Sequence, residues 1–91
     1  MNKQRRNAIK KIISELEKIK STILDKCDEV SNIQSEEEDA FDCMPESLQD
    51  GDRGCAMQEA IDMLDDISGN IEDIALDLEN EIDNLQSVID L

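Results

Sequence analysis

The chain has 91 residues, a formal net charge of −15 and Phe41 as its only aromatic residue. A chain of this length can form one small domain with a thin core, and an aliphatic composition favours packed helices over a sheet. The chain has no histidine, no Gly-rich phosphate loop and no nucleophile–base pair, which excludes the common catalytic and zinc-binding arrangements. We therefore expect no enzyme activity, no cofactor and no metal site.

The charges are unevenly distributed along the sequence. Eight of the nine basic residues lie in the first 26 positions, and from Cys27 onward Arg53 stands alone against 21 carboxylates. Such a surface repels nucleic acid and anionic membranes and attracts basic proteins. No apolar run is long enough for a signal peptide or a membrane span, so the sequence predicts a cytoplasmic protein.

The first predicted element is a helix over residues 4–43. Its apolar residues recur at steps of three and four, which is typical of a coiled-coil seam. In the alternative interpretation, the helix stops near Ile33 and the acidic run 35–39 is a loop. The predicted seam comprises Ile9, Ile12, Leu16, Ile19, Ile23, Val30 and Ile33. Ile13, Leu24 and Cys27 widen it to the three-position face that a bundle helix buries.

Residues 44–54 are predicted to reverse the chain. Pro45 disfavours helical geometry at the preceding residue, residues 45–48 can form one helical turn, and two glycines follow. Cys43 and Cys55 flank the reversal; we expect free thiols, with a disulfide between them as the alternative. The apolar residues of the reversal can pack back on the helices, which we favour, or contact a partner.

The second predicted helix covers residues 55–90. Its apolar stripe contains two successive steps of four, Ile74 to Leu78 to Ile82, which predict a local stutter. The two helices match in length and are joined by a short turn, so the predicted fold is all-α: an antiparallel two-helix hairpin, coiled-coil-like. Each helix buries only one stripe, and a homodimer forming a four-helix bundle would cover the remaining apolar edge.

The acidic residues of the second helix follow a pattern. With Met57 as the first heptad position, they fall at outer positions, and successive carboxylates lie about 5 to 6 Å apart, comparable with phosphates along a nucleic-acid strand. This pattern predicts a surface that binds a basic protein. The candidate partner-binding residues are Glu59, Asp62, Asp65, Asp66, Glu72 and Asp73 in the second helix, and Glu36, Glu37, Glu38, Asp39 and Asp42 before the turn.

Residues 36–49, EEEDAFDCMPESLQ, followed by Arg53-Gly54 and by AIDML at 60–64, resemble a group of small acidic proteins carried by phages and prophages of Gram-positive bacteria. The opening residues 5–9 and the closing acidic helix fit the same pattern. The resemblance implies an origin on a mobile element. Short acidic phage proteins often resemble anti-restriction and anti-CRISPR inhibitors that imitate DNA, so it also suggests an activity by analogy.

Two functions follow from these patterns. The first is a phage-encoded inhibitor, acting in the host bacterial cytoplasm, that blocks a basic nucleic-acid-binding surface of a defence nuclease or effector complex without binding nucleic acid or membrane itself. The alternative is a structural or assembly coiled-coil protein of a phage or mobile element. In the first, the acidic residues matter most. In the second, seam residues such as Leu64, Ile67, Ile71 and Ile74 do.

Overall fold

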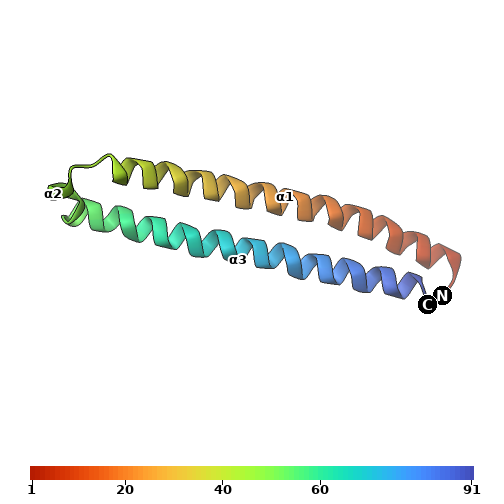
Figure 1. Ribbon diagram of the computed structural model, residues 1–91. Helices are drawn as coiled ribbons and strands as arrows, with labels where there is room; N and C mark the ends of the chain where they lie inside the picture. The colour runs from red at the N-terminus through yellow and green to blue at the C-terminus, as the bar shows by residue number, and fades with distance from the viewer. The chain divides into compact units, whose positions relative to one another are not determined.

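The computed structural model describes residues 1–91, and all of its regular structure is helical. Helix α1 spans Lys3–Asp42, α2 is the short helix Glu46–Gln49, and α3 spans Asp52–Ile89. Helices α1 and α3 pack antiparallel on the two sides of the reversal (Figure 1), so the predicted all-α helical hairpin is confirmed. No helix combines the length and the apolar character that crossing a membrane requires.

Helix α1 continues through the acidic run, so the alternative in which it stops near Ile33 is wrong. Gln34 directly precedes this run, and its Nε2 donates a hydrogen bond to Glu38 Oε1 at 3.2 Å, one turn further along. Beyond it, the side-chain amide of Gln49 donates to the carbonyl oxygens of Phe41 at 3.0 Å and Met44 at 3.2 Å. The last carbonyls of a helix lack partners within it. The Phe41 carbonyl accepts from the backbone N–H of Met44 at 3.0 Å as well as from Gln49 of α2.

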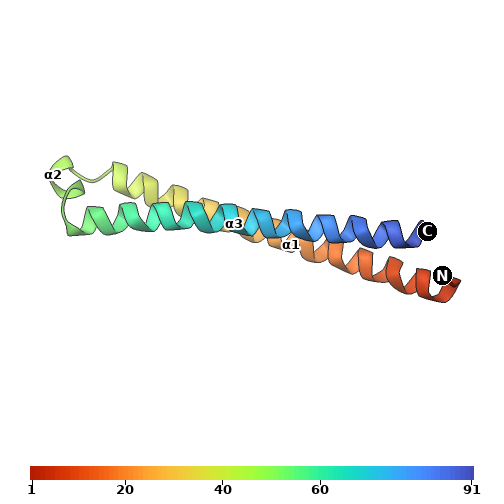
Figure 2. The ribbon, with the colours of Figure 1, turned by 90° about the horizontal axis from the view of Figure 1, so that it is seen from below.

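The reversal consists of α2 and the residues on either side of it, between the end of α1 and the start of α3 (Figure 2). Pro45 directly precedes α2 with ψ at 142°, which separates α2 from α1. No glycine has a positive φ. Gly54 is instead buried where the first turn of α3 passes the backbone of Gln49, so its role is to allow close approach rather than a left-handed backbone.

The chain forms two compact units, which we describe separately. The hairpin unit is Lys26–Asn70 and contains the reversal. Its buried hydrophobic side chains are Cys27 of α1 and Ile61 of α3. Half-buried neighbours complete its seam: Val30, Phe41, Met44, Met57 and Leu64.

The terminal unit combines Met1–Asp25 with Ile71–Leu91. Here the α1 and α3 segments pack through Ile13, Ala75 and Ile82, which are its buried hydrophobic residues. Lys20 Nζ lies 3.3 Å from Glu79 Oε1. This ion pair links the basic segment of α1 to the acidic segment of α3.

The predicted seam of α1 is partly wrong. Ile12, Ile19 and Ile33 are 45, 50 and 54 % exposed, so these seam residues were predicted wrongly. Ile13 and Cys27, predicted to widen the buried face, are buried, whereas Leu24, predicted with them, is 38 % exposed. On α1, apolar residues lie on both sides of a central row of seam residues. The neighbouring helix α3 covers this row and only one of the two sides, so the apolar residues on the other side stay exposed. The half-buried central row, which was predicted correctly, is Ile9, Leu16, Ile23 and Val30.

The predicted stutter in α3 is also wrong. Ala75 is 1 % exposed and Ile74 is 56 % exposed, so the smaller of two adjacent apolar residues occupies the seam. A small side chain there lets the α1 and α3 backbones of the terminal unit come close. The buried and half-buried residues then alternate regularly in steps of three and four: Ile61, Leu64, Ser68, Ile71, Ala75, Leu78, Ile82 and Leu85.

Candidate functional site

The acidic run before the turn is split over three sides of α1. Consecutive residues of an α-helix project about 100° apart around its axis. Glu37 is half-buried at the seam, and Glu38 bonds to Gln34 beside the seam. Glu36, two residues before Glu38, is exposed on the opposite side of the helix. These three predicted site residues therefore cannot contact one partner surface together.

Gln34 connects carboxylates of both long helices in the hairpin unit. Its Nε2 donates to Glu38 Oε1 of α1 at 3.2 Å and to Asp65 Oδ1 of α3 at 3.4 Å. On α3, Gln58 Nε2 donates to Asp62 Oδ1 at 3.0 Å, and residues three apart such as 62 and 65 share one side of a helix. The structure thus brings together Glu38, Asp62 and Asp65, which are far apart in sequence.

A shallow hollow of about 220 Å³ lies on the same side, lined by Glu38, Phe41, Asp42, Gln58 and Ile61. Its floor is apolar, formed by half-buried Phe41 and buried Ile61, and its carboxylates are exposed. An apolar floor with carboxylates above it matches the shape of a lysine or arginine side chain, which has an apolar stem and a cationic head. We call this surface the acidic flank; it consists of Gln34, Glu38, Asp42, Gln58, Asp62 and Asp65.

The other predicted site residues lie outside the acidic flank. Asp39 of α1 and Glu59 and Asp66 of α3 are exposed further from the seam, within about one third of a turn of the flank residues next to them. Glu72 and Asp73 are also exposed, but they belong to the terminal unit. The acidic flank therefore contains four of the predicted carboxylates: Glu38, Asp42, Asp62 and Asp65.

The hairpin unit carries 14 acidic residues and two basic ones, Lys26 and Arg53. Lys26 Nζ lies 2.8 Å from Glu29 Oε2, and this ion pair involves no residue of the acidic flank. Like charges on neighbouring helical positions repel one another. Positive charge placed against these positions would relieve that repulsion.

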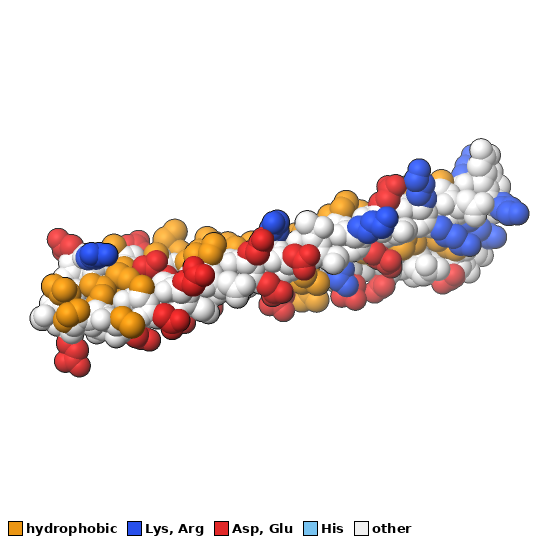
Figure 3. Space-filling model, turned by 90° about the horizontal axis from the view of Figure 1, so that it is seen from above, with side chains coloured by type: hydrophobic (Ala, Val, Ile, Leu, Met, Phe, Trp, Pro, Cys, Tyr) orange, Lys and Arg blue, Asp and Glu red, His pale blue; other side chains and the backbone are white.

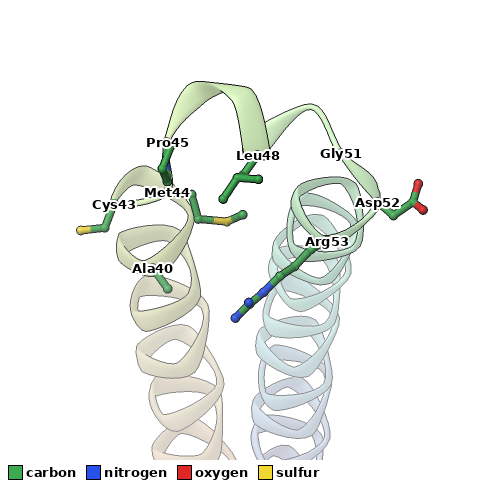
Figure 4. A pocket seen from close by; sticks show the side chains of 8 residues that line it. All are labelled: Ala40, Cys43, Met44, Pro45, Leu48, Gly51, Asp52 and Arg53. Carbon is green, nitrogen blue, oxygen red and sulfur yellow. The ribbon is translucent and has the colours of Figure 1, made fainter.

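A second hollow, of about 460 Å³, lies at the reversal (Figure 4). Met44 and Leu48 point toward each other in it, Arg53 extends from α3 toward α1, and Cys43 and Asp52 point away. Leu48 is 55 % exposed, whereas Met44 is half-buried. The prediction that the apolar residues of the reversal pack back on the helices therefore agrees with Met44 but not with Leu48. The hollow is lined by Ala40, Cys43, Met44, Pro45, Leu48, Gly51, Asp52 and Arg53.

The space-filling view shows hydrophobic side chains on the surface around the reversal, next to acidic ones, and basic side chains over the first part of α1 (Figure 3). Sequence patterns alone assign no role to Gln34, Gln58 or Arg53. The position of Arg53 as the only basic residue after Lys26 was a visible signal. Gln34 had no such signal, because its role depends on which residues of α3 it faces.

All three cysteines are free thiols, with Cys27 buried and Cys43 and Cys55 exposed.

Comparison with known proteins finds no matching family model, no similar curated protein and no similar solved structure.

Proposed function

We propose that the chain is an inhibitor that binds a basic, nucleic-acid-binding surface of another protein through its acidic flank. The observation that carries the proposal is the bridge from Gln34 to Glu38 and Asp65, which holds carboxylates of two helices on one side of the hairpin unit. Negative charge held in place on helices costs little ordering on binding, and it accelerates association with a basic surface.

The hollow of the flank gives the contact a specific form. A lysine or arginine of the target would lay its apolar stem on Phe41 and Ile61 and direct its cationic head to Glu38 and Asp42. Lysine and arginine side chains that bind nucleic-acid phosphates have this same combination of an apolar stem and a cationic head. The flank thus competes with nucleic acid for such residues.

The resemblance to small acidic phage proteins narrows the proposed target to a bacterial defence enzyme, of the type inhibited by anti-CRISPR or anti-restriction proteins. The chain would then act in the host bacterial cytoplasm. Basic residues are concentrated at the start of the chain, whereas residues 26–70 carry a net charge of −12. The hairpin unit is therefore the part of the chain suited to a basic target.

The test is a pull-down from a Gram-positive lysate at about 100 mM and about 500 mM salt, with mass spectrometry of the bound proteins. We expect a nucleic-acid-binding protein that is captured at low salt only and released by a competing DNA duplex. A flank variant, Glu38→Gln with Asp42→Asn, Asp62→Asn and Asp65→Asn, should lose the capture.

The matched control removes the same charge from exposed carboxylates outside the flank: Glu36→Gln with Glu46→Gln, Asp50→Asn and Asp77→Asn. It should retain the capture, because these residues do not line the hollow. Equal loss in both variants would show that only net charge matters, and unchanged capture by the flank variant would contradict the proposal.

A second candidate function, a structural or assembly coiled-coil protein, is favoured by the exposed isoleucines of both long helices, such as Ile33 and Ile67. In that case the pull-down would recover virion components at both salt concentrations. Substituting the flank carboxylates would then leave the recovered proteins unchanged, and substituting the isoleucines would not.

A further inference from the structure

The terminal unit has an apolar side that its own helices leave uncovered. Ile12 directly precedes buried Ile13 on α1, and Ile74 directly precedes buried Ala75 on α3. Ile13 and Ala75 are each the first of the two seam positions in their heptad, so Ile12 and Ile74 occupy the same heptad position, one residue before the seam. In an antiparallel helix pair, residues at this position on the two helices lie on the same side of the pair. Ile19, seven residues after Ile12, repeats the pattern and is 50 % exposed.

On the opposite side of the terminal unit, Lys20 Nζ lies 3.3 Å from Glu79 Oε1. The apolar side continues along α3 with Val88, two heptads after Ile74 and half-buried. We call Ile12, Ile19, Ile74 and Val88 the terminal apolar face. Glu81 is the acidic residue at the same heptad position, between Ile74 and Val88.

The terminal unit buries little for its size. Ile13, Ala75 and Ile82 are its buried hydrophobic residues, and no large side chain in the chain is fully buried. Two helices of this kind are marginal on their own. Covering the exposed isoleucines would therefore add apolar burial to a unit whose own core is small.

Charge indicates what covers the face. Residues 1–25 carry seven basic and three acidic side chains, whereas residues 71–91 carry seven acidic and no basic ones. A second copy can place its basic α1 segment against this acidic α3 segment and its α3 against this α1, so that both contacts pair opposite charges. Glu81 would then face a basic segment.

We infer that the chain forms a two-fold homodimer through the terminal apolar face, with α1 of each copy packed on α3 of the other. The interface is a four-helix arrangement of the terminal units, and it uses the same patch on both copies. It contains no residue of the acidic flank, and it does not depend on the proposed inhibitor function, because it concerns association of the chain with itself.

The test measures the mass of the purified chain by sedimentation velocity between about 1 µM and about 200 µM. We expect a concentration-dependent shift from the 10.3 kDa monomer to twice that mass. The midpoint of thermal unfolding should rise with protein concentration as well. A chain that stays monomeric over this range, with a constant midpoint, would overturn the inference and leave the face to a different partner.

The face variant is Ile19→Ala with Ile74→Ala, and the matched control is Leu24→Ala with Leu76→Ala. Each pair truncates one exposed aliphatic residue on α1 and one on α3, and Leu24 and Leu76 lie outside the face. Alanine keeps helix propensity high, so both variants should retain their helicity. We expect at least about tenfold weaker dimerisation for the face variant and less than about twofold for the control. Equal effects in the two variants would overturn the inference.

Discussion

Gly54 in the first turn of α3 lies against the backbone of Gln49, the last residue of α2. A Cβ atom on Gly54 would overlap the carbonyl group of Gln49, and what it meets is backbone rather than the end of a flexible side chain. The same Gln49 donates from its side chain to the carbonyls of Phe41 and Met44 at the end of α1. Contact between these two residues therefore ties the ends of both long helices to α2.

Gly54→Ala should destabilise the fold. The methyl group would force α2 away from α3 and weaken the cap that Gln49 provides, and overpacking of this kind costs about 1 to 3 kcal/mol. The free energy of unfolding, measured by urea denaturation with circular dichroism, should fall by that amount.

The control is the same substitution at Gly69, an exposed position of α3 where a Cβ atom meets nothing within 4 Å. Alanine is favoured over glycine inside a helix by about 1 kcal/mol, so Gly69→Ala should raise the free energy of unfolding. If both substitutions change it in the same direction, the close contact between Gly54 and Gln49 is not part of the native fold.

Lys20→Leu should stabilise the terminal unit. Lys20 occupies a seam position with its side chain 26 % exposed, and its partner Glu79 is 47 % exposed. A partly exposed ion pair contributes about 0 to 1 kcal/mol, whereas burying a leucine side chain contributes about 1.5 to 3 kcal/mol. We expect the free energy of unfolding to rise by about 1 kcal/mol. Lys18→Leu, the same change at an exposed position, should stay within about 0.5 kcal/mol of the parent.

The elements themselves were predictable from local patterns. The apolar spacing of α1 and α3 and the position of Pro45 are sufficient to place two long helices around a short reversal, because these signals act within a few residues. The end of α1 at Asp42 lies one residue from the predicted end, and α3 begins at Asp52, three residues before its predicted start. The first turn of α3 contains Gly54, a poor helix former, which explains the later predicted start.

The packed side of each helix was not predictable in the same way. Ile12 and Ile13, and likewise Ile74 and Ala75, are adjacent apolar residues, so periodicity alone permits either member at the seam. The choice depends on close packing between helices, for which small Ala75 is suited. The acidic flank has the same dependence, because the bridge from Gln34 to Asp65 exists only once that side of α1 faces α3.

Ser31 and Ser68 should be energetically coupled across the hairpin unit. Their hydroxyl oxygens lie 2.9 Å apart, between α1 and α3, and both residues are half-buried. A hydrogen bond of this kind contributes about 0.5 to 1.5 kcal/mol. In a double-mutant cycle with Ser31→Ala and Ser68→Ala, we expect a coupling energy of about 1 kcal/mol. Additive effects of the two substitutions would contradict this contact.

The three thiols should react with a maleimide at two distinct rates. Cys43 and Cys55 are exposed, whereas Cys27 is buried at the seam with its Sγ 3.3 Å from the carbonyl oxygen of Ser68. Alkylation requires an accessible thiolate, so Cys27 should react only when α1 and α3 of the hairpin unit separate. Intact mass spectrometry should show two labels added rapidly and a third added at least about tenfold more slowly.

Labelling in about 6 M urea provides the control, because all three thiols of the unfolded chain should react at one rate. The Ser31→Ala and Ser68→Ala double variant extends the test: a weaker contact beside Cys27 should accelerate the third label and leave the first two unchanged. If Cys27 of the native chain instead reacted as fast as Cys43, the observed seam of α1 would be incorrect.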